Sequence, residues 1–116
     1  MITLLLTILF GSNVIYVENI PEPKLVVVTG YSSTESQTDD TPFIMASGKR
    51  VYDGAIACPR KYKFGQKVEI TGKIYTCEDR KNIRYESYPE EWFDIWFESQ
   101  ELALNWGIEK LRVFIK

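Results

Sequence analysis

Short runs of alternating apolar and polar residues occur along most of this chain, and turn residues separate them. Alternation with a period of two is typical of strands, and β-branched and aromatic residues favour the same state. The pattern predicts strands over residues 24–31, 67–70, 73–79, 93–97 and 111–115, a turn followed by a buried strand over 51–58, and brief pairing over 43–47. This spacing favours a small closed β-barrel over alternating strands and helices.

One helix and one tight turn interrupt the strands. Ser99 is a good N-cap for a helix over residues 100–106, and Gly107 suits the position after its end. The tripeptide Thr71-Gly72-Lys73 is typical of a tight hairpin turn. We expect the polar segment 32–42 to be a long loop, and such loops are often functional.

The first ten residues form an apolar run that ends at Gly11-Ser12-Asn13. Its length is typical of a secretory signal, although no Lys or Arg precedes it. The alternatives are a buried strand or helix, or a membrane anchor over residues 1–17. Pro21 and Pro23 then indicate a linker. We therefore expect a signal-like or anchoring segment with its linker over residues 1–23, a folded domain over 24–116, and a secreted or cell-envelope protein.

Composition excludes several kinds of function. The 116 residues suit one domain, and 45% hydrophobic residues are enough for one core. A net charge of -2 provides no basic surface for nucleic acid. The absence of His excludes the usual four-ligand Cys/His zinc site, given only two Cys, and the Ser-His and Cys-His nucleophile pairs. Acid–base chemistry must come mainly from Asp and Glu, and we expect no metal or other cofactor.

An aspartate within an apolar strand is the most informative local feature. Asp94 lies in the middle of Phe93-Asp94-Ile95-Trp96-Phe97, where a charge is costly unless it is paired or hydrogen-bonded. Such a residue belongs either to a structural hydrogen-bond network or to a catalytic site. Asp79 ends the predicted strand 73–79, so we expect two carboxylates on neighbouring strands.

The two cysteines, Cys58 and Cys77, leave two interpretations open. In an exported protein an even pair indicates a disulfide, here closing a loop of about twenty residues. In a cytosolic protein they would be two small buried thiols. The choice therefore depends on export.

Seven segments follow one another in a recognisable order: Val28-Thr29-Gly30-Tyr31-Ser32, Asp40-Thr41-Pro42 with Met45-Ala46-Ser47-Gly48, Gly54-Ala55-Ile56-Ala57, Phe64-Gly65-Gln66-Lys67-Val68-Glu69-Ile70, Glu78-Asp79, Phe93-Asp94-Ile95-Trp96 and Ala103-Leu104-Asn105-Trp106-Gly107. In this order they resemble the 3D domain, a family named for three aspartates. It is the double-psi β-barrel module of MltA-type lytic transglycosylases and of stationary-phase survival proteins. No single motif is specific, so the similarity rests on the order of all seven.

The resemblance implies a mainly β, six- to seven-stranded double-psi barrel with one short helix, and a lytic transglycosylase that cleaves peptidoglycan. Asp94 matches the family's general acid, which later acts as the base, and partial burial among aromatic residues raises a carboxyl pKa as that role requires. A structural carboxylate that accepts backbone N–H bonds is the alternative for Asp94. Asp79 would orient Asp94 or raise its pKa through like charge, or would merely end a strand.

Five further residues would line the substrate groove: Tyr31, Asp40, Thr41, Ser47 and Trp96. Their structural alternatives are a polar loop lining, a turn at Asp-Thr-Pro and core packing of the tryptophan. The barrel would also bring Cys58 and Cys77 near each other, which favours the disulfide.

Two departures from the family pattern leave a second function open. Cys58 stands where many members carry an aspartate, and the charged segment 80–92 lacks the family's glycines. The alternative is therefore a non-catalytic barrel that binds cell-wall polysaccharide, similar to expansins. Under either function, the expected partner is peptidoglycan or a related polysaccharide.

Overall fold

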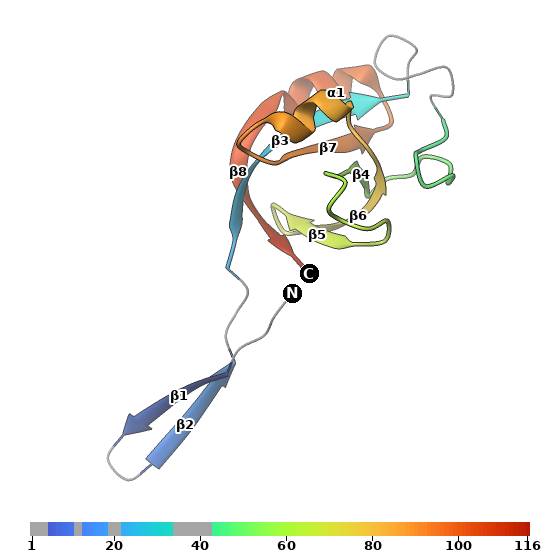
Figure 1. Cartoon of the computed structure of the whole chain (residues 1–116). Coiled ribbons are helices and arrows are strands. Elements are labelled where there is room, and N and C mark those ends of the chain that lie inside the picture. Colours follow the sequence, from blue (N-terminus) through green and yellow to red (C-terminus); the bar gives the residue numbers. More distant parts are fainter. Residues whose placement is uncertain (1–4, 11–12, 19–21, 34–42) are drawn as a thin grey trace.

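Six strands close into a barrel, and one short helix packs against it (Figure 1). The computed structural model describes residues 5–10, 13–18, 22–33 and 43–116. The barrel strands are β3 (Lys24–Ser32), β4 (Ala55–Ala57), β5 (Lys67–Ile70), β6 (Lys73–Asp79), β7 (Trp92–Phe97) and β8 (Ile108–Ile115). The helix is α1 (Gln100–Trp106), and a 3-10 helix, η1 (Ile83–Ser87), precedes β7. The predicted small, mainly β barrel with one short helix is confirmed, and it has six strands.

The strand pairing contains an internal symmetry that the amino-acid sequence does not display. Around the barrel the order is β3-β7-β4-β6-β5-β8. The pairs β3/β7 and β4/β6 are parallel, and the other four pairs are antiparallel. Exchanging β3-β4-β5 with β6-β7-β8 leaves every pairing unchanged. Two interlocked halves of this kind agree with the double-psi arrangement.

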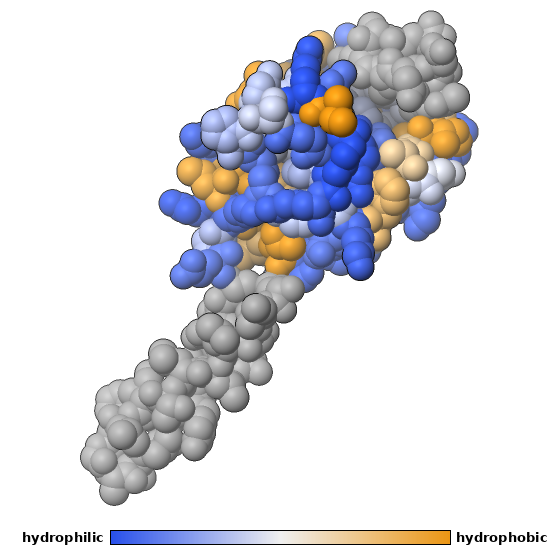
Figure 2. Space-filling view, viewed as in Figure 1, coloured by the Kyte–Doolittle hydropathy of each residue, from blue (hydrophilic) through white to orange (hydrophobic). Residues whose placement is uncertain are grey.

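The inward-facing side chains of these strands form one core. Val28 of β3, Ile56 of β4, and Phe93 and Ile95 of β7 are at most 1% exposed and belong to one cluster. Asp94 lies between the last two and points to the opposite side of β7, as a strand requires. Figure 2 shows mostly hydrophilic residues on the visible face, with apolar residues in small separate groups.

Helix α1 lies against β3 and β7 and approaches the backbone of Gly30. A Cβ atom at Gly30 would lie 2.8 Å from Cε2 of Phe97 and 2.9 Å from the carbonyl oxygen of Ala103. Real Cβ contacts are rarely so short, so a glycine is required where the helix crosses the sheet.

Local signals define the helix ends and the tight turn as predicted. The Ser99 side chain accepts a hydrogen bond from the N–H of Leu102, and Gly107 follows the helix with a φ of 70°. Thr71 and Gly72 have φ values of 49° and 84°, the left-handed backbone that a two-residue hairpin turn needs. These predictions are confirmed because each depends on adjacent residues alone.

Three segments differ in detail from the sequence-based expectation. Strand β8 begins at Ile108 rather than at residue 111, because the long strand β3 supplies partners as far as Thr29. Pairing within 43–50 amounts to an isolated bridge between Ile44 and Arg50. The charged connection 80–92 contains η1, which Asn82 caps by accepting a hydrogen bond from Arg84 N–H.

Before the barrel, β1 (Leu5–Phe10) and β2 (Asn13–Glu18) form an antiparallel hairpin. Figure 1 shows it extending away from the barrel. Within the described ranges, no helix has the length and apolar character needed to cross a membrane. Export or anchoring through residues 1–17 stays a prediction.

Candidate functional site

Asp79 and Asp94 lie in one row that crosses four strands. Asp79 of β6 pairs with Ala57 of β4, Ala57 with Asp94 of β7, and Asp94 with Thr29 of β3. The expectation of two carboxylates on neighbouring strands is therefore wrong, because β4 lies between β6 and β7. With strands about 4.8 Å apart, roughly 10 Å separates the two aspartate backbones. Ala57, which lies between them, is only 2% exposed.

Asp94 is held by two side-chain donors. Thr29 Oγ1 donates to Asp94 Oδ1 at 2.9 Å, and Lys81 Nζ lies 3.1 Å from Asp94 Oδ2. The Asp94 side chain is 13% exposed. Burial raises the pKa of the Asp94 carboxyl, the charge of Lys81 and the two hydrogen bonds act against that rise, and Asp79 adds slightly to it. The direction of the shift is the one predicted, and its main cause is burial.

Lys81 is the site residue that sequence reasoning missed. Its ammonium donates to Thr29 Oγ1 at 3.0 Å, so Lys81, Thr29 and Asp94 form a closed set of contacts. The same ammonium lies 4.5 Å from the ring centroid of Tyr85 and 5.9 Å from that of Trp92. The charged connection 80–92 was the available signal in the sequence, because Lys81, Tyr85 and Trp92 all lie within it. Trp92 is also the first residue of β7.

Asp79 belongs to a separate hydrogen-bond network. Tyr31 Oη donates to Asp79 Oδ2 at 2.8 Å, and the N–H groups of Ala46 and Arg80 each donate to Oδ1 at 2.9 Å. Burial, followed by the charge of Asp79, raises the pKa of Tyr31, so the phenol stays a donor at neutral pH. Asp79 thus ties β3 and the segment around Ala46 to the end of β6.

The other predicted groove residues are placed differently. Trp96 shares the Asp94 face of β7, and its Nε1 donates to Ser33 Oγ at 2.9 Å. Ser47 lies beside Glu78 rather than Asp94, because its backbone N–H donates to the Glu78 carbonyl oxygen at 2.9 Å. Asp40 and Thr41 lie outside the described residues, and nothing is added to their prediction.

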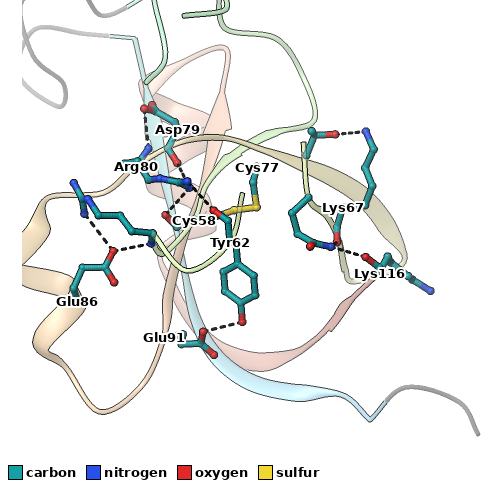
Figure 3. The surroundings of a disulfide bond; sticks show 12 residues. Cys58, Tyr62, Lys67, Cys77, Asp79, Arg80, Glu86, Glu91 and Lys116 are labelled. Carbon is teal, nitrogen blue, oxygen red and sulfur yellow. Dashed lines mark hydrogen bonds and ion pairs between the residues drawn. A yellow bond between two sulfur atoms is a disulfide. The ribbon is translucent and has the colours of Figure 1, made fainter. Parts of the chain in front are cut away.

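The predicted disulfide between Cys58 and Cys77 is confirmed, with 5.6 Å between the Cα atoms (Figure 3). It joins the end of β4 to β6, beside the row that contains Ala57 and Asp79. Cys58 therefore has a structural partner on β6.

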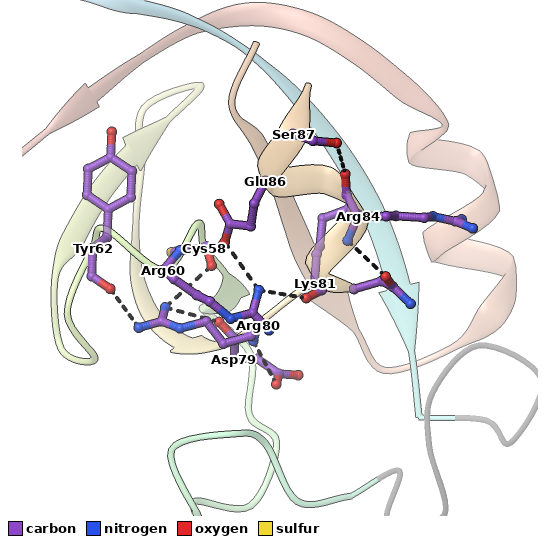
Figure 4. Close-up of polar contacts among 10 residues, drawn as sticks. Cys58, Arg60, Tyr62, Asp79, Arg80, Lys81, Arg84, Glu86 and Ser87 are labelled. Carbon is purple, nitrogen blue, oxygen red and sulfur yellow. Dashed lines mark hydrogen bonds and ion pairs between the residues drawn. The ribbon is translucent and has the colours of Figure 1, made fainter. Parts of the chain in front are cut away.

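The segment after Cys58 holds the connection 80–92 in place (Figure 4). Glu86 Oε1 accepts hydrogen bonds from the backbone N–H of Arg60 at 2.8 Å and from its guanidinium at 3.2 Å. The connection also donates to the segment after Cys58, since the Arg80 guanidinium donates to the Tyr62 carbonyl oxygen at 2.7 Å. These contacts fix both sides of Lys81, which explains how a surface connection delivers an ammonium to Asp94.

Glu91 anchors the far end of the same connection. It accepts a hydrogen bond from Tyr62 Oη at 2.8 Å and forms ion pairs with Lys24 and Lys61. Burial acts to raise the pKa of Glu91, but its hydrogen bonds with Lys24, Lys61 and Tyr62 outweigh that effect and lower it. Glu91 is therefore an ionised anchor between the connection, β3 and the segment after the disulfide.

Among the described residues, no three His, Cys, Asp or Glu side chains are grouped as metal ligands would be. Comparison with protein-family models finds no match, and comparison with curated proteins finds none either. The site is thus a largely buried carboxyl with a raised pKa, next to a cation, on the side of a barrel strand that faces away from the core.

Proposed function

We propose that this protein cleaves the glycan strands of peptidoglycan as a lytic transglycosylase, with Asp94 as its acid and then its base. The observation that carries the proposal is the position of Asp94, whose pKa is raised by burial while its carboxyl is held by Thr29. Cleavage of a glycosidic bond requires an acid that holds its proton near neutral pH. A raised pKa is the property that this step needs.

The reaction would use one carboxyl group in two roles. Protonated Asp94 gives its proton to the leaving glycosidic oxygen as the C–O bond breaks. The resulting carboxylate then takes the proton of the same sugar's 6-hydroxyl, whose oxygen closes onto the anomeric carbon. The reaction consumes no water and needs no second nucleophile. Asp79 fits this scheme because its oxygens already accept three hydrogen bonds, which leaves it poorly suited to activate water.

Lys81 sets a condition on this chemistry. Its ammonium favours the ionised form of Asp94 and so opposes the raised pKa. The proposal therefore requires substrate binding to move Lys81 away from Asp94 Oδ2. Export is also required, and the disulfide agrees with an oxidising compartment.

The same ion pair favours a second candidate function. If Lys81 stays on Asp94, the carboxylate is a structural anion that fixes the connection 80–92 to β7. The aromatic side chains of that connection then bind polysaccharide without cleavage. This candidate is a non-catalytic cell-wall-binding barrel.

Product analysis separates the two candidates. The full chain is incubated with purified peptidoglycan, and soluble products are identified by mass spectrometry beside Asp94→Asn. Anhydro-muropeptides from the unchanged chain, lost in Asp94→Asn and kept in Asp53→Asn, support the transglycosylase. Asp53 is a suitable control because its side chain is 85% exposed and pairs only with Lys73 among the described contacts. Glycan binding without any release supports the binding barrel instead.

A further inference from the structure

Two hollows flank Asp94 along strand β7, and each is lined by a tryptophan two residues away from it. We infer that a glycan strand lies along this side of β7, with one sugar ring in each hollow and the stretch of strand between those rings passing over Asp94. The inference rests on the proposed glycan substrate and identifies the residues that select it.

The geometry of β7 places the three side chains in line. Phe93 and Ile95 are buried in the core, so Trp92, Asp94 and Trp96 share the opposite side of the strand. At a rise of about 3.3 Å per residue, roughly 13 Å separates the two tryptophan backbones, with Asp94 midway. A ligand that contacts both tryptophans must therefore be elongated and must pass the carboxyl.

The first hollow lies between β7 and the connection 80–92. Its aromatic wall contains Trp92, Tyr85 and Tyr88, and the ring centroid of Trp92 lies 5.1 Å from that of Tyr85 and 5.8 Å from that of Tyr88. Asn82 and Glu90 add hydrogen-bonding groups to the lining. Aromatic faces beside a few polar groups suit a pyranose ring, which has apolar faces and a rim of hydroxyls.

Lys81 connects this hollow to the acid. Its side chain lines the hollow while its ammonium contacts Asp94 Oδ2 at 3.1 Å. A sugar ring that enters beside Trp92 competes with the ammonium for the face of Tyr85, 4.5 Å away. Occupation of the first hollow is thus a direct way to release Asp94 from its cation.

The second hollow lies on the other side of Asp94. Trp96, Phe43 and Arg50 contribute to its lining, together with Ser33 and Glu98. The Arg50 guanidinium lies 5.1 Å from the centroid of the Phe43 ring, on the exposed surface. This pairing supplies an apolar face and a cation, which suits a sugar that carries a carboxylate substituent.

Binding is tested apart from cleavage with the full-length Asp94→Asn variant and peptide-free glycan strands. Isothermal titration measures Kd, and tryptophan fluorescence reports contact with the hollows. Tyr88→Ala and Arg50→Ala, one for each hollow, are the test variants because both residues are exposed and their loss leaves the core intact. Leu104→Ala on α1 and Arg112→Ala on β8 are matched surface controls.

We expect each test variant to weaken binding roughly three- to tenfold, the range for one aromatic or charged contact, while the controls keep the original Kd. The inference is overturned if strands do not bind, if both test variants bind like the controls, or if stem peptides alone bind. Cleavage by the unchanged chain is scored separately. If binding depends on both hollows but no cleavage occurs, the transglycosylase proposal fails and the inference about the hollows stands. If cleavage occurs but neither test variant changes Kd, the inference fails and the transglycosylase proposal stands.

Discussion

Lys81 Nζ lies 3.1 Å from Asp94 Oδ2 and 3.0 Å from Thr29 Oγ1, and the side chains of Lys81 and Asp94 are each 13% exposed. A pair so little exposed loses much of its hydration, and the mutual attraction together with the Thr29 hydrogen bonds offsets that loss. Removal of one partner is then more harmful than removal of both. This asymmetry makes the pair testable by mutation.

Lys81→Met should destabilise the fold by about 1–3 kcal/mol at a pH where Asp94 is ionised, because the buried carboxylate is left without its cation. The free energy of unfolding is measured by urea titration between pH 3 and pH 8. The loss should shrink as the pH falls and Asp94 takes up a proton. The double variant Lys81→Met/Asp94→Asn should recover part of the stability, and a loss independent of pH would contradict the assignment.

If Asp94 is the acid, Lys81→Met should also move the pH profile of cleavage. The ammonium opposes the burial-driven rise in the pKa of Asp94, so its removal raises that pKa further. The alkaline limb of kcat/KM against pH, which reports the free enzyme, should therefore shift to higher pH, since Asp94 keeps its proton to a higher pH. An unchanged limb would show that Asp94 does not supply the proton.

Glu91→Gln should lower stability at pH 7 and have little effect in acid. The folded-state pKa of Glu91 is lowered by its hydrogen bonds with Lys24, Lys61 and Tyr62, which outweigh burial. Its contribution is fully present above the unfolded pKa and is lost as the pH falls through the folded value. Urea titrations from pH 2 to pH 7 check this, with exposed Glu109→Gln as the control. A constant difference across that range would refute the anchoring role.

Reduction of the disulfide should cost about 3 kcal/mol of stability, the chain-entropy value for a loop of this length. The link spans 19 residues and joins β4 to β6. The measurement is urea unfolding with and without a reductant. The variant Cys58→Ala/Cys77→Ala should resemble the reduced protein and should not respond to reductant.

Gly30→Ala should destabilise by about 2 kcal/mol, because the added Cβ meets Phe97 and the backbone oxygen of Ala103. The backbone oxygen belongs to α1 and has no rotamer with which to move aside. Gly72→Ala is an informative contrast, since nothing lies within 4 Å of its Cβ position but its φ is +84°. It should cost about 1 kcal/mol from backbone strain alone. Thermal unfolding compares the stability of the two variants. If Gly30→Ala is as stable as the unchanged protein, α1 must shift freely to make room for the added Cβ.

Much of the architecture was predictable because it depends on residues close in the chain. The apolar alternation of β5, β6 and β7 identified those strands to within about one residue. The cap at Ser99, the glycine after α1 and the turn at Thr71-Gly72 each follow from the conformational preferences of adjacent residues.

The site was less predictable, because its parts come from distant segments. Asp94 was found as a charge within an apolar strand, and the direction of its pKa shift followed from burial. Ala57 between the two aspartates, Lys81 on Asp94 and the bond between Tyr31 and Asp79 were not foreseen. These relationships depend on β4 inserting between β6 and β7, and strand order in a barrel with crossing connections is not the order in the chain.

The amino-acid sequence by itself determined the strands, the helix ends and the presence of a costly charge at Asp94, since each is a property of local pattern. Only the tertiary structure decided which groups surround that charge. Long-range pairing brings Thr29 and Lys81 to Asp94 from 65 and 13 residues away, and it gives Asp79 a network of its own. The apolar residues next to Asp94 in the sequence predict that burying its carboxyl costs free energy. The groups that offset this cost come from distant segments, so only the tertiary structure identifies them.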